Sequence, residues 1–251
     1  MIAPLALAGC LVALWLLSLK LHDSSLIDLF WGPAFAVVLW PDVMQNGATP
    51  RALLVAGLVT LWGVRLGAYL AWRNLGHGED KRYTAMRAKH GAAWWWRSLF
   101  IVFGLQGVLV WVVSLPVRAV ATAPMSDWGL SDVLGTTLVL TGVLFESLGD
   151  LQLARFKADP ANKGKIMDRG LWRYTRHPNY FGDFVTWWGF GVFGLATGAW
   201  WTLLGPVVMS VLLTKVSGKD LLEQGMRGRP GYDDYLRRTS GFIPLPPKAA
   251  T

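Results

Sequence analysis

Charged residues are scarce in this chain of 251 residues. They make up 16% of the sequence, against 53% for hydrophobic residues, whereas a soluble domain usually carries about a quarter charged residues. The charges are also unevenly placed, because long apolar stretches alternate with short basic ones. This pattern is typical of a protein solvated by lipid and argues against an ordinary soluble domain. The fifteen tryptophans agree with it, since the indole ring prefers the headgroup region of a bilayer.

Residues that bind metals or form disulfides are equally few. The single cysteine, Cys10, lies in an apolar run and has no partner for an intramolecular disulfide. The four histidines are scattered without a His-x-x-x-His pair, so we expect no metal centre. The formal net charge is +8, but no run of lysine and arginine resembles a nucleic-acid-binding arm. Membrane lipids or an anionic cofactor are therefore the expected partners, and nucleic acid is not.

The apolar stretches predict seven transmembrane helices in a single all-α membrane domain. A helix needs about 20 mostly apolar residues to cross the hydrocarbon core of a bilayer. The second stretch is short and contains Pro33, so we expect that helix to be kinked or tilted. The expected spans are 2–20, 26–41, 52–72, 98–117, 128–149, 180–198 and 200–216.

The basic residues indicate the orientation of these spans. With seven spans and the N-terminus outside, the loops after the first, third and fifth spans are cytoplasmic, and so is the C-terminus. Most of the 24 lysines and arginines fall in those segments, and only Arg51 and Arg118 fall in loops of the opposite side. Because cytoplasmic loops carry an excess of Lys and Arg, we predict this orientation, in a bacterial inner membrane.

Charged residues inside the predicted spans are candidate catalytic groups. An ionisable group in hydrocarbon is costly unless it is paired or hydrated. Asp28 lies in the second span, and Arg65 lies deep in the third. Either the two form an ion pair that holds their helices together, or they form the polar floor of a pocket where a substrate oxygen meets a proton donor. The sequence leaves both alternatives open.

A dense polar segment, residues 168–183, leads into the sixth span. A cytoplasmic flank needs only basic residues, whereas this segment carries Asn179 and Asp183 into the apolar stretch. Its arginines suit phosphate groups, because a planar guanidinium binds phosphate oxygens in pairs. Glu146 and Asp150 lie four residues apart in the fifth span and so share one helix face.

Three basic and aromatic segments, 155–160, 168–183 and 223–238, are expected on the same side of the membrane and suggest one large polyanionic ligand. A dinucleotide phosphate fits that description. No Gly-x-Gly-x-x-Gly follows a strand, which excludes a Rossmann site as the means of binding it.

Residues 170–183, GLWRYTRHPNYFGD, together with Tyr235 and Ile243-Pro244, resemble the C-terminal domain of steroid 5α-reductases and their bacterial relatives. The segments Leu26–Gly32 and Glu79–Tyr83 are similar to a bacterial branch described as a domain of unknown function. The same superfamily includes isoprenylcysteine carboxyl methyltransferases, which have similar Arg-His-Pro-x-Tyr and Tyr…Ile-Pro elements. The resemblance is good over residues 141–251, expected to bind the cofactor, and loose over residues 1–140, expected to form the substrate side.

The resemblance to the reductases implies NADPH as the cofactor. It also implies an acid in the second span and a tyrosine in the third that hold the carbonyl group of the substrate. Asp28 matches the acid, but Trp62 occupies the tyrosine position, and we expect Tyr69, one turn after Arg65, to substitute for it. The cofactor-binding residues expected from the polar segments and the resemblance are Asp150, Lys157, Arg169, Tyr174, Arg176, His177, Asn179, Tyr180, Asp183 and Tyr235.

The expected function is an NADPH-dependent oxidoreductase that reduces the double bond of an enone in a steroid or another lipid-like substrate, with Asp28, Arg65 and Tyr69 as catalytic residues. A methyltransferase that uses S-adenosylmethionine is the first alternative. The spelling His177-Pro178 favours it, whereas the number of arginines favours the reductase, because a methyl donor has no phosphates. The second alternative is a lipid-binding or scaffold protein without catalysis, whose role would not depend on Asn179 or Asp183.

Overall fold

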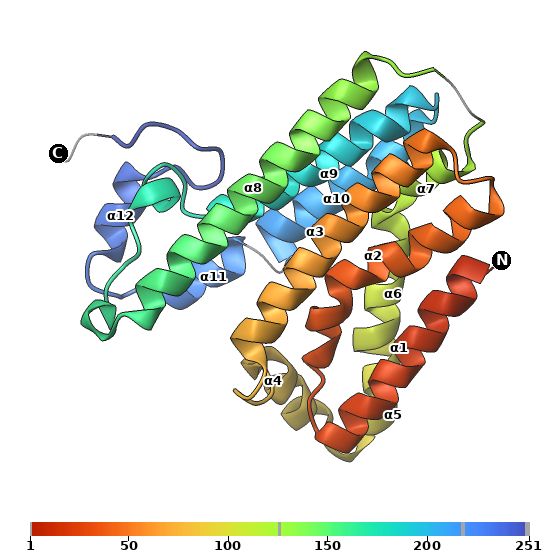
Figure 1. Ribbon diagram of the computed structural model, residues 1–251. Helices are drawn as coiled ribbons and strands as arrows, with labels where there is room; N and C mark the ends of the chain where they lie inside the picture. Colours follow the sequence, from red (N-terminus) through yellow and green to blue (C-terminus); the bar gives the residue numbers. More distant parts are fainter. Residues whose placement is uncertain (1, 125–126, 217–218, 249–251) are drawn as a thin grey trace. The chain divides into compact units, whose positions relative to one another are not determined.

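The computed structural model describes residues 2–124, 127–216 and 219–248. Over these residues the chain is helical, apart from one isolated bridge between Thr175 and Ser240, which confirms the all-α prediction. The chain divides into two compact units (Figure 1). Unit 1 comprises Met1–Trp128 and Gly194–Leu204, and unit 2 comprises Gly129–Phe193 and Gly205–Thr251.

Unit 1 is built on three long helices, α1 (Ile2–Leu21), α2 (Leu26–Gln45) and α3 (Pro50–Asn74). Each packs on the next in the chain. Thr49 caps α3 by accepting a hydrogen bond from the backbone N–H of Ala52, and Pro50 at the first helical position suits a helix start. Shorter helices complete the unit: α4 (Lys81–His90), η1 (Gly91–Ala93), α5 (Trp94–Ser98), the π-helical turn η2 (Leu99–Gly104), α6 (Leu105–Val113), α7 (Leu115–Thr122) and η5 (Trp200–Leu203).

The contact between α2 and α3 depends on two glycines. A methyl group on Gly32 would overlap the backbone carbonyl of Gly63, and one on Gly63 would overlap that of Gly32. The helices therefore approach more closely than larger residues would permit. Beside this contact, Phe35 and Trp62 are fully buried, with their ring centres 5.4 Å apart.

The predicted span 98–117 is interrupted near its end. α6 ends at Val113, and α7 begins after Ser114, with Pro116 in its first turn. Arg118 lies inside α7, so the prediction that it lies in a loop is wrong. Its Nε is 2.7 Å from Asp42 Oδ2, and its guanidinium stacks 3.7 Å from the centre of the Trp111 ring. These partners stabilise the charge within a helix.

Unit 2 contains α8 (Leu130–Ala158), η3 (Pro160–Asn162), η4 (Gly170–Arg173), α9 (Pro178–Ala196), α10 (Leu204–Val211), the π-helical turn η6 (Leu212–Val216), α11 (Lys219–Met226) and α12 (Tyr232–Arg238), although the ends of α9 and α10 reach into unit 1. Glycines again allow a close contact, because a methyl group on Gly142 of α8 would overlap Gly182 and Thr186 of α9. Trp187, Phe190 and Phe193 of α9 form the buried apolar core of this unit.

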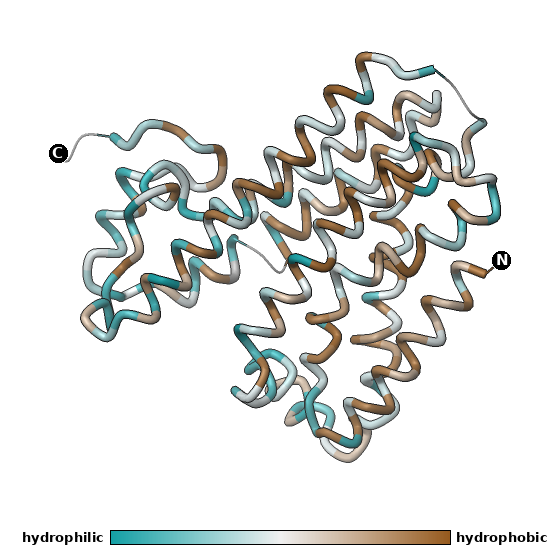
Figure 2. The backbone as a smooth tube through the Cα atoms, viewed as in Figure 1, coloured by the Kyte–Doolittle hydropathy of each residue, from teal (hydrophilic) through white to brown (hydrophobic). Residues whose placement is uncertain are grey.

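Five helices in the described residues are long and apolar enough to cross a membrane: Ile2–Leu21, Leu26–Gln45, Pro50–Asn74, Lys81–Val113 and Leu130–Ala158. They correspond to the first five predicted spans. The sixth and seventh predicted spans correspond to α9 and to the shorter helices between Trp200 and Val216. Figure 2 shows the hydrophilic residues gathered in the turns and around α11 and α12. These features are those of an integral membrane protein.

We expect Gly32→Ala to destabilise the protein, because the added methyl group meets backbone atoms that no side-chain rotation can move. Overpacking of this kind costs about 1–3 kcal/mol. Gly57→Ala in α3 is the matched control, since the space around Gly57 is open and alanine is the better helix former. The thermal unfolding midpoint in detergent should fall for Gly32→Ala and stay level or rise for Gly57→Ala. Equal midpoints for the two variants would contradict this account of the α2–α3 contact.

Candidate functional site

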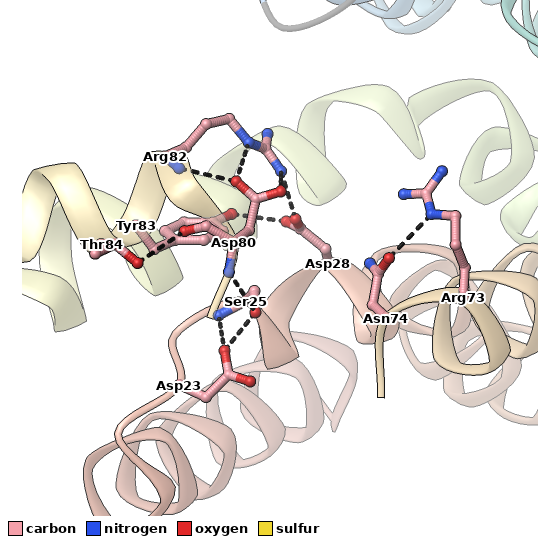
Figure 3. Close-up of polar contacts among 9 residues, drawn as sticks. All are labelled: Asp23, Ser25, Asp28, Arg73, Asn74, Asp80, Arg82, Tyr83 and Thr84. Carbon is pink, nitrogen blue, oxygen red and sulfur yellow. Dashed lines mark hydrogen bonds and ion pairs between the residues drawn. The ribbon is translucent and has the colours of Figure 1, made fainter. Parts of the chain in front are cut away.

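A polar network surrounds Asp28 at the start of α2 (Figure 3). The hydroxyl of Tyr83 donates a hydrogen bond to Asp28 Oδ1 at 2.7 Å, and Nη2 of Arg82 donates one to Asp28 Oδ2 at 2.7 Å. Tyr83 is 5% exposed, whereas the side chain of Arg82 is 47% exposed. The carboxylate is therefore held by a buried phenol and a half-exposed guanidinium, both from α4, and not by Arg65, its partner in one of the two alternatives.

The start of α4 is fixed by Asp80. Its carboxylate accepts a hydrogen bond from the backbone N–H of Arg82 at 2.9 Å, which caps the helix. The same carboxylate lies 3.0 Å from Nε of Arg82. Although burial opposes ionisation, these hydrogen bonds lower the pKa of Asp80 below its ordinary value. Asp80 thus orients the guanidinium of Arg82 so that it also contacts Asp28.

A second set of contacts ties the turn after α3 to the turn between α1 and α2. Glu79 accepts a hydrogen bond from the backbone N–H of Ser24 at 2.8 Å, and it forms a two-pronged ion pair with Arg87 at 2.8 and 3.1 Å. Burial opposes ionisation of Glu79, but the bonds from Arg87 and Ser24 outweigh it and lower the pKa of the carboxyl group. Glu79 therefore joins the segment before α4 both to Ser24 and to Arg87 of α4, which fixes the helical turn that carries Arg82 and Tyr83.

The other two predicted catalytic residues, Arg65 and Tyr69, lie one turn apart on α3, and both are half-buried. The ring of Tyr69 lies 6.0 Å from that of Trp72, with the guanidinium of Arg73 5.6 Å from its centre. The tyrosine that contacts Asp28 in the structure is Tyr83.

In unit 2, buried acids line the contact between α8 and α9. Glu146 and Asp150 of α8 and Asp183 of α9 are 3%, 4% and 6% exposed. Asn179, one turn before Asp183, donates a hydrogen bond from Nδ2 to Asp150 Oδ1 at 3.2 Å. Three predicted cofactor-binding residues therefore come from two adjacent helices, with an amide already in contact with a carboxylate.

Arg176 and His177 both contact Glu223 of α11. The guanidinium of Arg176 lies 3.0 and 3.2 Å from the two oxygens of Glu223 on α11, and it also donates to the carbonyl oxygen of Thr239. His177 Nε2 lies 3.0 Å from Glu223 Oε1, and since a carboxylate can only accept, Nε2 carries the proton. Together the two side chains hold α11 and the C-terminal segment, and their part in cofactor binding stays a prediction.

The protonation of this cluster follows from its geometry. Burial opposes ionisation of Glu223, but the hydrogen bonds from His177 and Arg176 outweigh it and lower the pKa of Glu223 to about 2. Burial lowers the pKa of His177 below its usual value, although Glu223 opposes the shift. The cluster is therefore a carboxylate held by a guanidinium and a neutral imidazole at pH 7.

Two predicted tyrosines also have structural contacts. The hydroxyl of Tyr235 donates to the carbonyl oxygen of Trp172 at 2.6 Å, and burial raises the pKa of Tyr235. The ring of Tyr180 stacks on His177 at 5.6 Å. The adjacent C-terminal segment is held by bonds from Thr175 Oγ1 to the carbonyl oxygen of Phe242 at 2.7 Å and from the N–H of Leu245 to that of Tyr174 at 3.0 Å.

The exposed members of the predicted set are Lys157, Arg169 and Tyr174. The guanidinium of Arg169 lies 5.9 Å from the centre of the Phe156 ring, and the side chain of Tyr174 is 44% exposed. Arg173, between them in sequence, is also exposed. Solvent and ligands can reach these four side chains, of which Lys157 lies in α8 and the other three in the polar segment. Among the residues that the structure describes, no group of histidine, cysteine and acidic side chains could hold a metal ion.

A family described as "Protein of unknown function (DUF1295)" matches residues 14–239. The chain belongs to this family. An uncharacterized protein of Schizosaccharomyces pombe, C594.04c, is 26% identical over an alignment that covers 92% of this chain and 75% of the relative. No solved structure matches. The expected resemblance to a family of unknown function is thus confirmed, and it extends through both units, whereas the branch of the superfamily stays a prediction.

The residues of this DUF1295 chain that sequence reasoning missed are Arg82 and Tyr83 as partners of Asp28. They lie in the segment Glu79–Tyr83, which resembles the family but whose sequence alone predicts no role. A signal was present, because an aspartate that caps a helix, followed at once by arginine and tyrosine, places two hydrogen-bond donors in the first helical turn.

We expect acid to weaken the Glu223 cluster of the DUF1295 chain. Because the pKa of Glu223 in the folded protein is about 2 and its ordinary value is 4.5, its contribution to stability is complete above pH 4.5 and is lost as the pH falls toward 2. The unfolding midpoint of wild type should therefore exceed that of Glu223→Gln by more at pH 7 than at pH 3.5. A difference that does not change with pH would exclude an ionised Glu223 as the source of the stabilisation.

Proposed function

We propose that this membrane protein is an NADPH-dependent reductase of the carbon–carbon double bond of an enone in a steroid or other lipid-like substrate. The observation that carries the proposal is the arrangement in unit 2, where Asn179 bonds to Asp150, Asp183 lies buried one turn further along α9, and the same polar segment carries exposed arginines. Buried directional groups suit the amide and ribose parts of a dinucleotide, and exposed guanidinium groups suit its phosphates.

The side chains of unit 2 fit such a cofactor once the structural residues are set apart. Arg176, His177 and Tyr235 hold the C-terminal segment. We therefore assign phosphate binding to the exposed side chains of Lys157, Arg169 and Arg173, and stacking to Tyr174. The bound cofactor would supply a hydride for the β-carbon of the enone. Residues of the chain would supply binding, orientation and charge stabilisation.

In unit 1, the network around Asp28 supplies the donors that the carbonyl group of the substrate requires. When a hydride adds to the β-carbon, negative charge develops on the carbonyl oxygen. Arg82 would stabilise that charge as a hydrogen-bond donor, because only some of its N–H groups are used by Asp28 and Asp80. Tyr83 donates its single O–H to Asp28, and Asp28 would hold Arg82 in position. A proton from water on the α-carbon completes the reduction to the saturated ketone. Asp28 thereby has a positioning role in place of the acid role expected from sequence.

We also propose seven membrane spans, with the N-terminus outside and the C-terminus in the cytoplasm. The 19 residues of α9 and the 17 residues between Trp200 and Val216 would supply the sixth and seventh spans. The excess of lysine and arginine in the turns on one side supports this orientation. In a bacterial inner membrane, the exposed arginines of unit 2 would then face the cytoplasmic pool of NADPH.

The cofactor is tested by the thermal unfolding midpoint of the purified protein with NADPH, NADH or S-adenosylmethionine, since a ligand that binds only the folded state raises the midpoint. We expect NADPH to raise it most. Arg169→Gln should weaken NADPH binding by about tenfold, as expected for the loss of a hydrogen bond to a charged group. Arg229→Gln removes an exposed charge elsewhere in unit 2 and should leave binding unchanged. A rise with S-adenosylmethionine alone would assign the protein to the methyltransferases instead.

The role of the Asp28 network is tested by Tyr83→Phe, with Tyr69→Phe as the matched control. We expect Tyr83→Phe to lower the rate of NADPH oxidation with an enone by about a hundredfold, because Asp28 without the bond from Tyr83 no longer fixes Arg82 toward the developing oxyanion. NADPH binding should be unchanged in both variants. The assays need a panel of steroid enones and unsaturated lipids. Loss of turnover in Tyr69→Phe but not in Tyr83→Phe would return the role to Tyr69.

A further inference from the structure

The segment from α4 to α5 carries exposed basic and aromatic side chains that the proposed reaction does not use. Two of its arginines have carboxylate partners, since Arg82 contacts Asp28 and Asp80, and Arg87 contacts Glu79. Lys89 and Arg97 are exposed, and neither forms an ion pair with any carboxylate in the part of the chain that the structure describes. Their charge is therefore available to an external anion.

Arg97 is held in a defined position without a counter-ion. Its Nη1 lies 3.0 Å from Nδ1 of His90, and its guanidinium lies 5.3 Å from the centre of the Trp96 ring. Since arginine can only donate, Nδ1 of His90 accepts and Nε2 carries the proton. The His90 ring in turn stacks on Trp94 at 6.0 Å, with the planes 16° apart. An imidazole and an indole thus fix the guanidinium and leave its other donors free.

The backbone beneath these side chains is anchored to the rest of unit 1. Trp94 is 3% exposed and donates a hydrogen bond from Nε1 to Ser24 Oγ at 3.3 Å. Nε1 of Trp15, on α1, donates to the carbonyl oxygen of Trp95 at 2.9 Å, and Ser98 is fully buried. Figure 1 shows α5 at the same end of unit 1 as the last turns of α1. The cluster is therefore presented from a fixed base.

Two indole rings border the charges on the outer surface. Trp95 is 58% exposed and Trp96 is 43% exposed. In a protein with membrane-spanning helices, exposed tryptophans occupy the headgroup level, where the apolar ring meets lipid chains and the indole N–H meets water. Here a guanidinium and an ammonium lie in the same short segment as the rings. This combination matches a molecule with an anionic phosphate and an apolar tail.

We propose that Arg97, Lys89 and His90, with Trp95 and Trp96, form a binding site for the headgroup of an anionic phospholipid. A guanidinium fixed on one side can bind two phosphate oxygens at once, and Lys89, the residue before His90, adds a second positive charge in the same segment. The acyl chains pack along the exposed indole rings. A zwitterionic lipid presents the same phosphate, but its own ammonium group competes for it, so the site selects lipids with net negative charge.

The test uses the full-length protein in neutral detergent and native mass spectrometry with phosphatidylglycerol or phosphatidylcholine. Wild type should bind phosphatidylglycerol more tightly than phosphatidylcholine. A basic residue close to an anionic lipid surface contributes about 1 kcal/mol, so Arg97→Gln should weaken phosphatidylglycerol binding by about fivefold or more. Binding of phosphatidylcholine should not change. Arg97→Lys keeps the charge without the paired donors and should show an intermediate loss.

Arg73→Gln is the matched control, because Arg73 is exposed in the last turn of α3 and its Nε bonds to the neutral side chain of Asn74. It should bind phosphatidylglycerol like wild type. Equal losses in Arg73→Gln and Arg97→Gln would show diffuse attraction and overturn the site, and so would equal binding of the two lipids by wild type. Inorganic phosphate should not displace phosphatidylglycerol, and displacement would show a site for free phosphate instead. An unfolding midpoint measured for every variant separates loss of binding from loss of fold.

Discussion

A carboxylate at the end of a membrane-spanning helix has few ways to be satisfied, and Asp28 shows what this constraint requires of a structure. Its partners must come from a segment that folds back against the start of α2, which places the first turn of α4 there and supplies Tyr83 and Arg82. Asp80 caps that turn, and the pair of Glu79 and Arg87 holds it against the turn between α1 and α2. Much of this end of unit 1 is thus arranged around the need to pair buried charge.

The same constraint divides the basic residues of unit 2 into two groups. The guanidinium of Arg176 is largely buried and bonded to several partners. If it moved to a ligand, the partly buried carboxylate of Glu223 would lose its countercharge. An exposed guanidinium such as that of Arg169 loses little when it binds an anion. Burial and partners, rather than proximity in sequence, therefore decide which arginine of the polar segment is available to a ligand. Of these basic residues, only the exposed ones belong to the proposed cofactor site.

Features that depend on local sequence could be predicted from the chain, and those that depend on distant contacts could not. The apolar runs predicted the long helices α1 and α3 closely, because length and hydropathy determine a helix in lipid, whereas α8 continues to Ala158, beyond the predicted end at 149. The sequence did not predict that the chain continues as a second helix, α7, after Ser114. The charge of Arg118 in α7 is stabilised by Asp42, which is distant in sequence, and by Trp111. Likewise, the sequence near Arg176 does not predict its ion pair with Glu223, which lies 47 residues away. The pairing of Asp28 with Tyr83 spans 55 residues; the sequence around Asp80 indicates two donors in a first helical turn but not their partner.

Exposed basic groups in both units raise the question of how one protein could bind different anions selectively. Charge alone does not discriminate, because it attracts lipid phosphates and dinucleotide phosphates equally and is screened by salt. The neighbouring groups differ. Arg97 lies beside exposed indole rings, which favour a ligand with acyl chains, whereas Arg169 lies in a segment that leads to buried amide and carboxylate groups, which favour a ligand with directional polar parts. Selectivity then comes from what surrounds each guanidinium, and a lipid that fits the first site gains nothing from the second.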